Sequence, residues 1–241
     1  MTAITGWFPP TLRLDRLSSQ DVNFAATLVG MASVTRKPPT SRQQRREEIE
    51  RRLLDATERL MGDGTSFTEL SVDRLATEAG MSRASFYIYF EDKGHLLRRL
   101  AGQVFGDLAS GAERWWQVAA RRDPDDVHAA MNAIIASYRR HQPLLIALSE
   151  MAGYDPLVAA TYRELLTGIS GRVARVIEDG QADGSIRRAL PVAATASALT
   201  WMVERACQQN LPAQDSDYDA ELSAALTEIV WGALYLNPTS R

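Results

Sequence analysis

The breaks in the hydrophobic pattern constrain this 241-residue chain more than any other feature. From Ser41 onward, apolar residues recur with the three- and four-residue spacing of one helix face. The segments end at residues that start or stop helices, such as Asp123-Pro124, Asp183-Gly184 and Pro212. No alternating pattern of useful length favours a β-strand. The sequence therefore predicts an all-α fold of about nine helices.

Two short predicted helices follow a first one that begins at Ser41 and stops at Gly62. The first of the pair starts after Ser71 and ends at Gly80, where glycine suits the left-handed conformation past a helix end. Ser82 caps the next, which runs to about residue 90. A short glycine-containing turn between two helices is typical of a helix-turn-helix, whose second helix lies in the DNA major groove.

Six longer amphipathic segments follow. We expect helices at residues 93–120, 125–140, 143–152, 156–182, 191–209 and 216–236.

Basic residues gather ahead of the predicted helix-turn-helix, although the whole chain carries a net charge of −3. Residues 36–46 contain five basic residues and no acidic one, including Arg45 and Arg46. From residue 101 onward, 12 Lys and Arg stand against 17 Asp and Glu. A phosphate backbone would therefore be attracted to the N-terminal part and repelled by the rest.

Residues 1–40 contain four prolines and no sustained helical periodicity, so we expect a poorly ordered N-terminal extension. The apolar stretch at residues 22–34 faintly resembles a signal peptide but is too short to span a bilayer. A start of translation at Met31 is an alternative to export.

Metal and cofactor chemistry find little support in the sequence. The chain has one cysteine, Cys207, and its three histidines, His95, His128 and His141, lack the spacing of metal ligands. No zinc-protease motif or phosphate-binding loop occurs. We expect no cofactor and no enzymatic activity.

The run from Ala76 to Phe90, followed by Asp92, Lys93 and Leu96, resembles the DNA-binding signature of the TetR family of transcriptional regulators. The C-terminal part resembles the EthR-type branch of that family, above all at residues 201–205. The resemblance implies a cytoplasmic homodimer formed by the last two helices, operator DNA as partner, and repression relieved by a small apolar ligand. We expect a DNA-binding domain at residues 41–92 and a ligand-binding and dimerisation domain at 93–241.

The first turn of the predicted recognition helix holds the candidate base contacts, because a helix N-terminus in the groove reaches base edges. These residues are Arg83, Ala84 and Ser85, and the alternative is a solvated turn that only caps the helix. Tyr87 resembles the family tyrosine that meets a phosphate, or else packs as a half-buried aromatic.

Phosphate contacts are expected from a second set of residues. The resemblance makes Lys93 a phosphate clamp, and the helix starts at Ser71 and Ser82 offer free backbone N–H groups. Arg45 and Arg46 would add salt-sensitive affinity, unless they form an ordinary solvated face.

Bulky aromatic and thioether side chains in the later helices are the candidates for a ligand pocket, although most such residues are core. Trp201 and Met202 are the strongest candidates. The others are Phe105, Tyr138, Met151 and Tyr162. Glu204 and Arg205 are interpreted as a structural ion pair.

The final predicted helix is apolar over more than half of its circumference, so it needs two buried faces, one of them against a partner subunit. Three functions compete: a ligand-responsive repressor, a DNA-binding protein without a ligand, and an all-α enzyme or small-molecule carrier. A void-free C-terminal core would favour the second.

Overall fold

The computed structural model describes residues 41–62 and 64–235, and the expected N-terminal extension lies outside them. All regular structure in these two ranges is helical, with nine α-helices and two short 3-10 turns. The all-α prediction is confirmed, and the six long helices agree with their expected bounds to within two residues wherever the residues are described. Over the same ranges, no helix is long and apolar enough to cross a membrane.

The first three helices form what we call the head: α1 (Arg42–Gly62), α2 (Val72–Glu78) and α3 (Arg83–Tyr89). The expected capping box begins α1, where the Gln44 N–H donates to Ser41 Oγ at 3.1 Å and the Ser41 N–H to Gln44 Oε1 at 2.9 Å. The centre of the head is closely packed. Its fully buried side chains include Leu53, Phe67, Leu75, Phe86 and Phe90.

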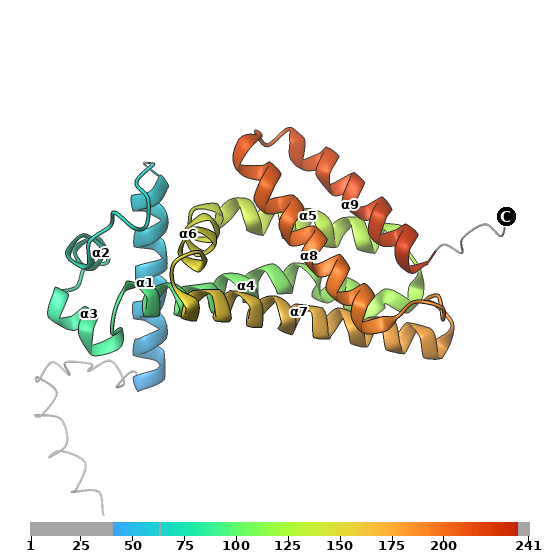
Figure 1. Cartoon of the computed structure of the whole chain (residues 1–241), viewed down its shortest axis with the longest axis horizontal. Helices are drawn as coiled ribbons and strands as arrows, with labels where there is room; N and C mark the ends of the chain where they lie inside the picture. The colour runs from blue at the N-terminus through green and yellow to red at the C-terminus, as the bar shows by residue number, and fades with distance from the viewer. Residues whose placement is uncertain (1–40, 63, 236–241) are drawn as a thin grey trace, which may run out of the picture. The chain divides into compact units, whose positions relative to one another are not determined.

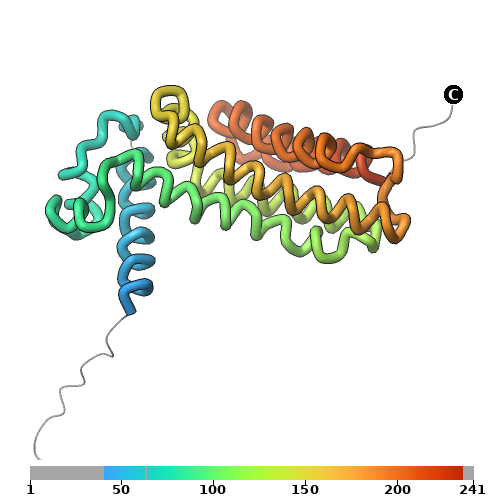
Figure 2. Tube along the Cα trace, turned by 60° about the horizontal axis from the view of Figure 1, so that its bottom comes forward, coloured from blue at the N-terminus to red at the C-terminus, as the bar shows by residue number. Residues whose placement is uncertain are grey.

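The remaining helices form the body. They are α4 (Lys93–Val118), α5 (Pro124–Arg140), α6 (Gln142–Ala152), α7 (Pro156–Asp183), α8 (Val192–Asn210) and α9 (Tyr218–Leu234), with 3-10 turns at Ala119–Arg121 and Leu211–Ala213. Figures 1 and 2 show α4 and α7 running side by side away from the head, with α8 along α7. Helix α9 packs on α5, and α6 lies next to the head, where it contacts α1.

Helices α4 and α5 approach each other closely at Gly111. A Cβ atom at this position would lie 3.1 Å from the Ala133 Cβ, closer than ordinary side-chain contacts. Glycine therefore permits this approach of the two helices.

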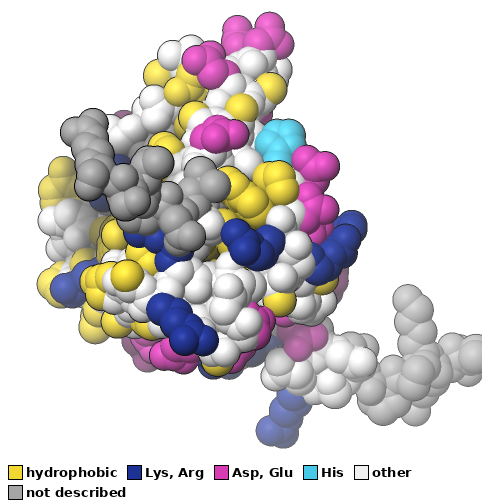
Figure 3. Space-filling model, turned by 90° about the vertical axis from the view of Figure 1, so that its right-hand side faces the viewer, with side chains coloured by type: hydrophobic (Ala, Val, Ile, Leu, Met, Phe, Trp, Pro, Cys, Tyr) yellow, Lys and Arg dark blue, Asp and Glu magenta, His cyan; other side chains and the backbone are white. Residues whose placement is uncertain are grey.

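The end of the body opposite the head carries charges of both signs. In Figure 3, basic and acidic side chains alternate with hydrophobic ones over the described part of this face. Such a mixed surface is typical of a solvated face rather than of a phosphate-binding one.

Candidate nucleic-acid interface and internal cavity

The turn between α2 and α3 is fixed by local hydrogen bonds. Ser71 Oγ accepts the N–H of Arg74, and Ser82 Oγ accepts the N–H of Ser85, as expected of the two N-caps. Gly80 has φ +66°, which is the left-handed conformation that ends α2. The orientation of α3 relative to α2 is therefore set by the backbone and by two serine side chains.

Helix α3 has a buried face and an exposed face. Phe86 and Phe90 are buried and hold the helix against the head. On the exposed face, the Arg83 guanidinium donates to Asp73 Oδ2 at 2.9 Å and lies 5.7 Å from the centre of the Tyr87 ring. The Arg83 and Asp73 side chains are each 59% exposed, so water or a nucleic acid can compete for this ion pair.

Two further residues on α3 are open to solvent. Ala84 is exposed, and Ile88 is 76% exposed although it is a large apolar residue. Sequence reasoning missed Ile88. The available signal was its position two residues after Phe86 and two before Phe90, which turns it away from the buried face.

Lys93 is placed differently from our expectation of a phosphate clamp. Its ammonium donates to the carbonyl oxygens of Phe67, Thr68 and Leu70 at 3.2, 2.9 and 2.7 Å. An ammonium group has three N–H donors, so all three are already used. Lys93 therefore fastens the loop before α2 to the start of α4, and burial lowers the pKa of its amine.

The two candidate arginines on α1 differ in their exposure and in their contacts. Arg45 is exposed, whereas the Arg46 Nε donates to Glu50 Oε1 at 3.2 Å. Glu50 is buried and also accepts from Arg99 at 2.8 Å and from Gln103 at 3.0 Å on α4. Arg46 thus belongs to a polar network that joins α1 to α4, and phosphate contact by Arg45 and by the starts of α2 and α3 stays a prediction.

A second polar link between head and body centres on His141, which is buried between α5 and α6. Its Nδ1 lies 2.6 Å from Glu58 Oε1 on α1, and its Nε2 lies 3.2 Å from Asp107 Oδ2 on α4. The hydrogen bond to Glu58 raises the pKa of the imidazole, while burial opposes that rise. A protonated imidazole donates to both carboxylates and so joins three helices.

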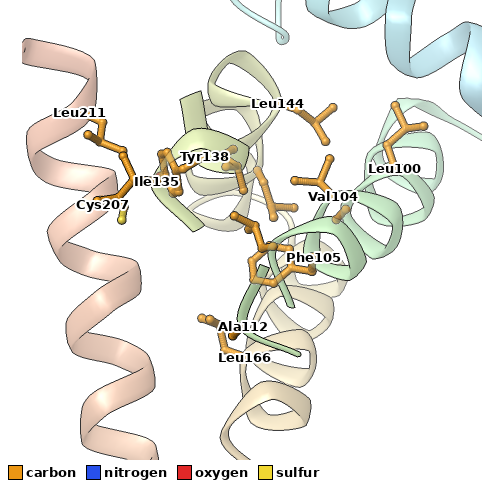
Figure 4. Close-up of a cluster of buried hydrophobic side chains, with 14 of the residues drawn as sticks. Leu100, Val104, Phe105, Ala112, Ile135, Tyr138, Leu144, Leu166, Cys207 and Leu211 are labelled. Carbon is orange, nitrogen blue, oxygen red and sulfur yellow. The ribbon is translucent and has the colours of Figure 1, made fainter. Parts of the chain in front are cut away.

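The body contains a cavity of about 90 Å³, partly open to solvent. This volume exceeds what a single water molecule needs but is below that of most small-molecule sites. Figure 4 shows a cluster of buried hydrophobic side chains from several helices, and two that it labels, Phe105 of α4 and Tyr138 of α5, also line the cavity. The lining is almost wholly apolar and comes from α4 to α9.

Three of the six predicted ligand residues line the cavity, namely Phe105, Tyr138 and Tyr162. Trp201, Met202 and Met151 are not among its lining residues, and their contact with a ligand stays a prediction. The α8 residues that face the cavity follow helical spacing and are Leu199, Thr200, Val203, Glu204 and Cys207. Positions 201 and 202 turn away from that face. Trp201 packs edge-on against the Tyr162 ring instead, with centres 6.4 Å apart.

Glu204 lies on the cavity wall, which sequence reasoning did not anticipate. Its side chain is 8% exposed, and its Oε1 accepts a hydrogen bond from the Tyr162 hydroxyl. Its Oε2 has no hydrogen-bond partner, but it forms the expected ion pair with Arg205, whose Nε lies 3.9 Å away. Burial raises the pKa of the Glu204 carboxyl, and burial with the hydrogen bond to Glu204 raises the pKa of Tyr162.

Two family models match separate parts of this architecture. The model for bacterial regulatory proteins of the tetR family matches residues 53–100, which run from α1 into α4. The model for the C-terminal domain of the transcriptional regulator EthR matches residues 127–235, which hold most of the cavity wall. The chain belongs to the TetR family of transcriptional regulators. The tetR-family match thus covers most of the head and the start of α4, and the EthR-like match covers most of the body.

The relatives of this TetR-family chain are regulators too. The HTH-type transcriptional regulator EthR of Mycolicibacterium smegmatis is 26% identical over 207 residues, which cover 85% of this chain and 95% of that protein. EthR of Mycobacterium tuberculosis strain H37Rv is 27% identical over 160 residues, covering 66% and 74%. The transcriptional regulator FadR from Bacillus subtilis, solved in complex with stearoyl-CoA, shares the fold with a TM-score of 0.61 at 15% identity, covering 77% of this chain and 99% of FadR.

Proposed function

We propose that this protein is a dimeric, cytoplasmic repressor that releases its operator when a small, largely apolar ligand fills the cavity of the body. The observation that carries the DNA-binding half is the exposed face of α3. Phe86 and Phe90 anchor the helix, and the opposite face offers a guanidinium, a phenol and an isoleucine side chain to a groove.

The exposed groups on α3, and the half-buried Ser85, each suit a part of DNA. Arg83 can donate two parallel hydrogen bonds to a guanine edge, and Ala84 and Ile88 can contact thymine methyl groups. Ser85 can meet a polar base edge, and the Tyr87 hydroxyl can donate to a phosphate. A single such helix reads few base pairs, so two copies in a dimer would address two half-sites separated by one or more helical turns.

The outer face of α9 supports the proposed dimer. Leu222, Leu226 and Val230 are buried against the body, whereas Ile229 is 50% exposed on another side of the same helix. A second subunit packed there would bury it.

The cavity favours a ligand-responsive regulator over a DNA-binding protein without a ligand. A packed helical core leaves few voids larger than a water molecule. A cavity of this volume therefore lowers the stability of the protein unless a ligand fills it. FadR, whose solved structure holds stearoyl-CoA, supports the idea that this fold can bind a long apolar molecule.

The experiment that tests the DNA-binding assignment is a selection from a random duplex library, followed by gel-shift titration at fixed salt. We expect the wild-type protein to enrich an inverted repeat. Arg83→Ala should weaken binding to it roughly tenfold or more, because a bidentate base contact is lost. Arg188→Ala, which removes an exposed arginine of the body, is the matched control and should bind normally. Equal affinity of the Arg83 and Arg188 variants would overturn the assignment.

A further inference from the structure

The cavity wall contains a buried carboxylate oxygen that the protein itself leaves unused as an acceptor. Of the other polar groups on the wall, the Thr200 hydroxyl donates to the Ala196 carbonyl at 2.9 Å, and the Tyr162 hydroxyl donates to Glu204 Oε1. The indole N–H groups of Trp115 and Trp116 are buried donors without a partner. Glu204 Oε2 is left without any partner. A buried carboxylate oxygen without a donor costs free energy, so its retention in an apolar wall calls for an explanation.

The nearest cation to this carboxylate is Arg205, whose Nε lies 3.9 Å from Oε2, beyond hydrogen-bond distance. Arg205 is half-exposed, and its Nη1 donates to Gln208. The negative charge of Glu204 also acts on a neighbouring thiol. Burial raises the pKa of Cys207 to about 12, and the charges of Glu204 and Asp219 add to that rise.

We infer that Glu204 is the polar anchor of the cavity and that the effector is an apolar molecule carrying a protonated amine. An ammonium group supplies the hydrogen-bond donor that Oε2 lacks, and its positive charge strengthens that hydrogen bond. The adjacent faces and edges of Phe105 and Tyr162, whose ring centres are 5.7 Å apart, provide a hydrophobic and weakly cation-attracting surround.

The remaining cavity sets the shape of the rest of the ligand. It extends along α4 from Phe105 to Trp116, a span of about 16 Å at 1.5 Å per helical residue. This length is lined by apolar and aromatic side chains, so it suits an alkyl or aryl body. An anionic head group is disfavoured at Glu204, because two like charges would share one desolvated site.

This inference rests on the proposed ligand-binding function, and a matched series of probes separates the two. The probes are decylamine, 1-decanol and decanoate, which share a chain and differ in the head group. Binding to the full-length protein is measured by isothermal titration calorimetry and by the fluorescence of Trp115 and Trp116, which line the cavity. We expect decylamine to bind at least about tenfold more tightly than 1-decanol, and decanoate to bind most weakly.

The variant Glu204→Gln keeps the shape of the side chain and removes its charge. It should bind 1-decanol as the wild type does and lose the preference for decylamine. Glu164→Gln, an exposed glutamate on α7, is the matched control and should keep that preference. Since the wild-type ranking of the probes needs no variant, the inference is testable even if Glu204→Gln does not fold.

Three other outcomes would count against the inference. Equal affinity for decylamine and 1-decanol would overturn the anchor while supporting an apolar ligand site. A preference for decylamine that survives Glu204→Gln would overturn the role of this residue. Failure of all three probes to bind would overturn both the anchor and the ligand-responsive half of the proposed function.

Discussion

The head leaves one buried side-chain polar atom of its described residues without a hydrogen-bond partner, Arg52 Nε, whereas the body leaves several. In the head, the serine caps of α2 and α3 are paired, and the Lys93 ammonium that closes the loop before α2 has three carbonyl partners. In the body, Glu204 Oε2 and Trp116 Nε1 are buried on the cavity wall without a hydrogen-bond partner. An interior with few unpaired polar groups suits a module that presents a rigid helix, whereas unpaired polar groups on a cavity wall suit a module that accepts a ligand.

The two regions are joined by polar links as well as by packing. Glu50 accepts hydrogen bonds from side chains on α1 and α4. His141 lies within hydrogen-bond distance of carboxylates on the same two helices. If a ligand in the cavity shifts α4, the shift would reach the hydrogen bonds of both Glu50 and His141. It would move the head only if these hydrogen bonds stay intact, so variants of the two residues test the coupling between body and head.

The largest expected effect is a loss of stability when a buried leucine is replaced by alanine, and it should differ between the head and the body. Leu53→Ala in the head should lower the free energy of unfolding by about 4 kcal/mol, because it leaves a new void in a packed core. Leu166→Ala on the cavity wall should cost only about 2 kcal/mol, because that side chain already lacks neighbours on one side. Urea unfolding of both variants measures the difference. Equal losses would mean that the body is packed as completely as the head.

The next effect concerns the His141 link and depends on pH. The folded-state pKa of His141 is raised, so its ionic hydrogen bonds stabilise the protein fully below the unfolded pKa of about 6.5 and fade as pH rises through the folded-state value. His141→Gln should therefore cost about 2 kcal/mol near pH 6 and progressively less at higher pH. Urea unfolding from pH 5.5 to 9 tests this. The control His128→Gln, at an exposed histidine, should show a constant small effect. A cost of His141→Gln that does not change with pH would contradict the link.

The smallest effect concerns the exposed ion pair on the head. Asp73 holds the Arg83 guanidinium in the free protein, so Asp73→Asn should release it and tighten binding to the selected duplex by about twofold. The neighbouring exposed Glu69→Gln changes charge equally and is the control. If both variants tighten binding to the same extent, general charge and not the ion pair is responsible.

The helices could be predicted from sequence because their signals are local. Ser71, Ser82 and Gly80 each act on the backbone within a few residues, and the structure places each as expected. The cavity residues were harder, because the face of α8 that turns inward is decided by its packing against α7. Trp201 and Glu204 differ by less than one turn, and nothing in their local sequence says which of them faces the cavity.

Lys93 shows the same limit in the head. Its three carbonyl partners lie 23 to 26 residues earlier in the chain. The loop before α2 returns to the start of α4 only in the folded head, so a phosphate clamp and an internal clamp have the same local sequence.

The most direct test of the whole account is the affinity of a cavity-filled variant for the selected duplex. Ala112 is buried on the cavity wall, and Ala112→Phe would place an aromatic ring in the empty space. The account predicts that this variant stays folded and dimeric by circular dichroism and light scattering, and binds the duplex at least about tenfold more weakly at fixed salt. A folded, dimeric Ala112→Phe protein with wild-type affinity would contradict it.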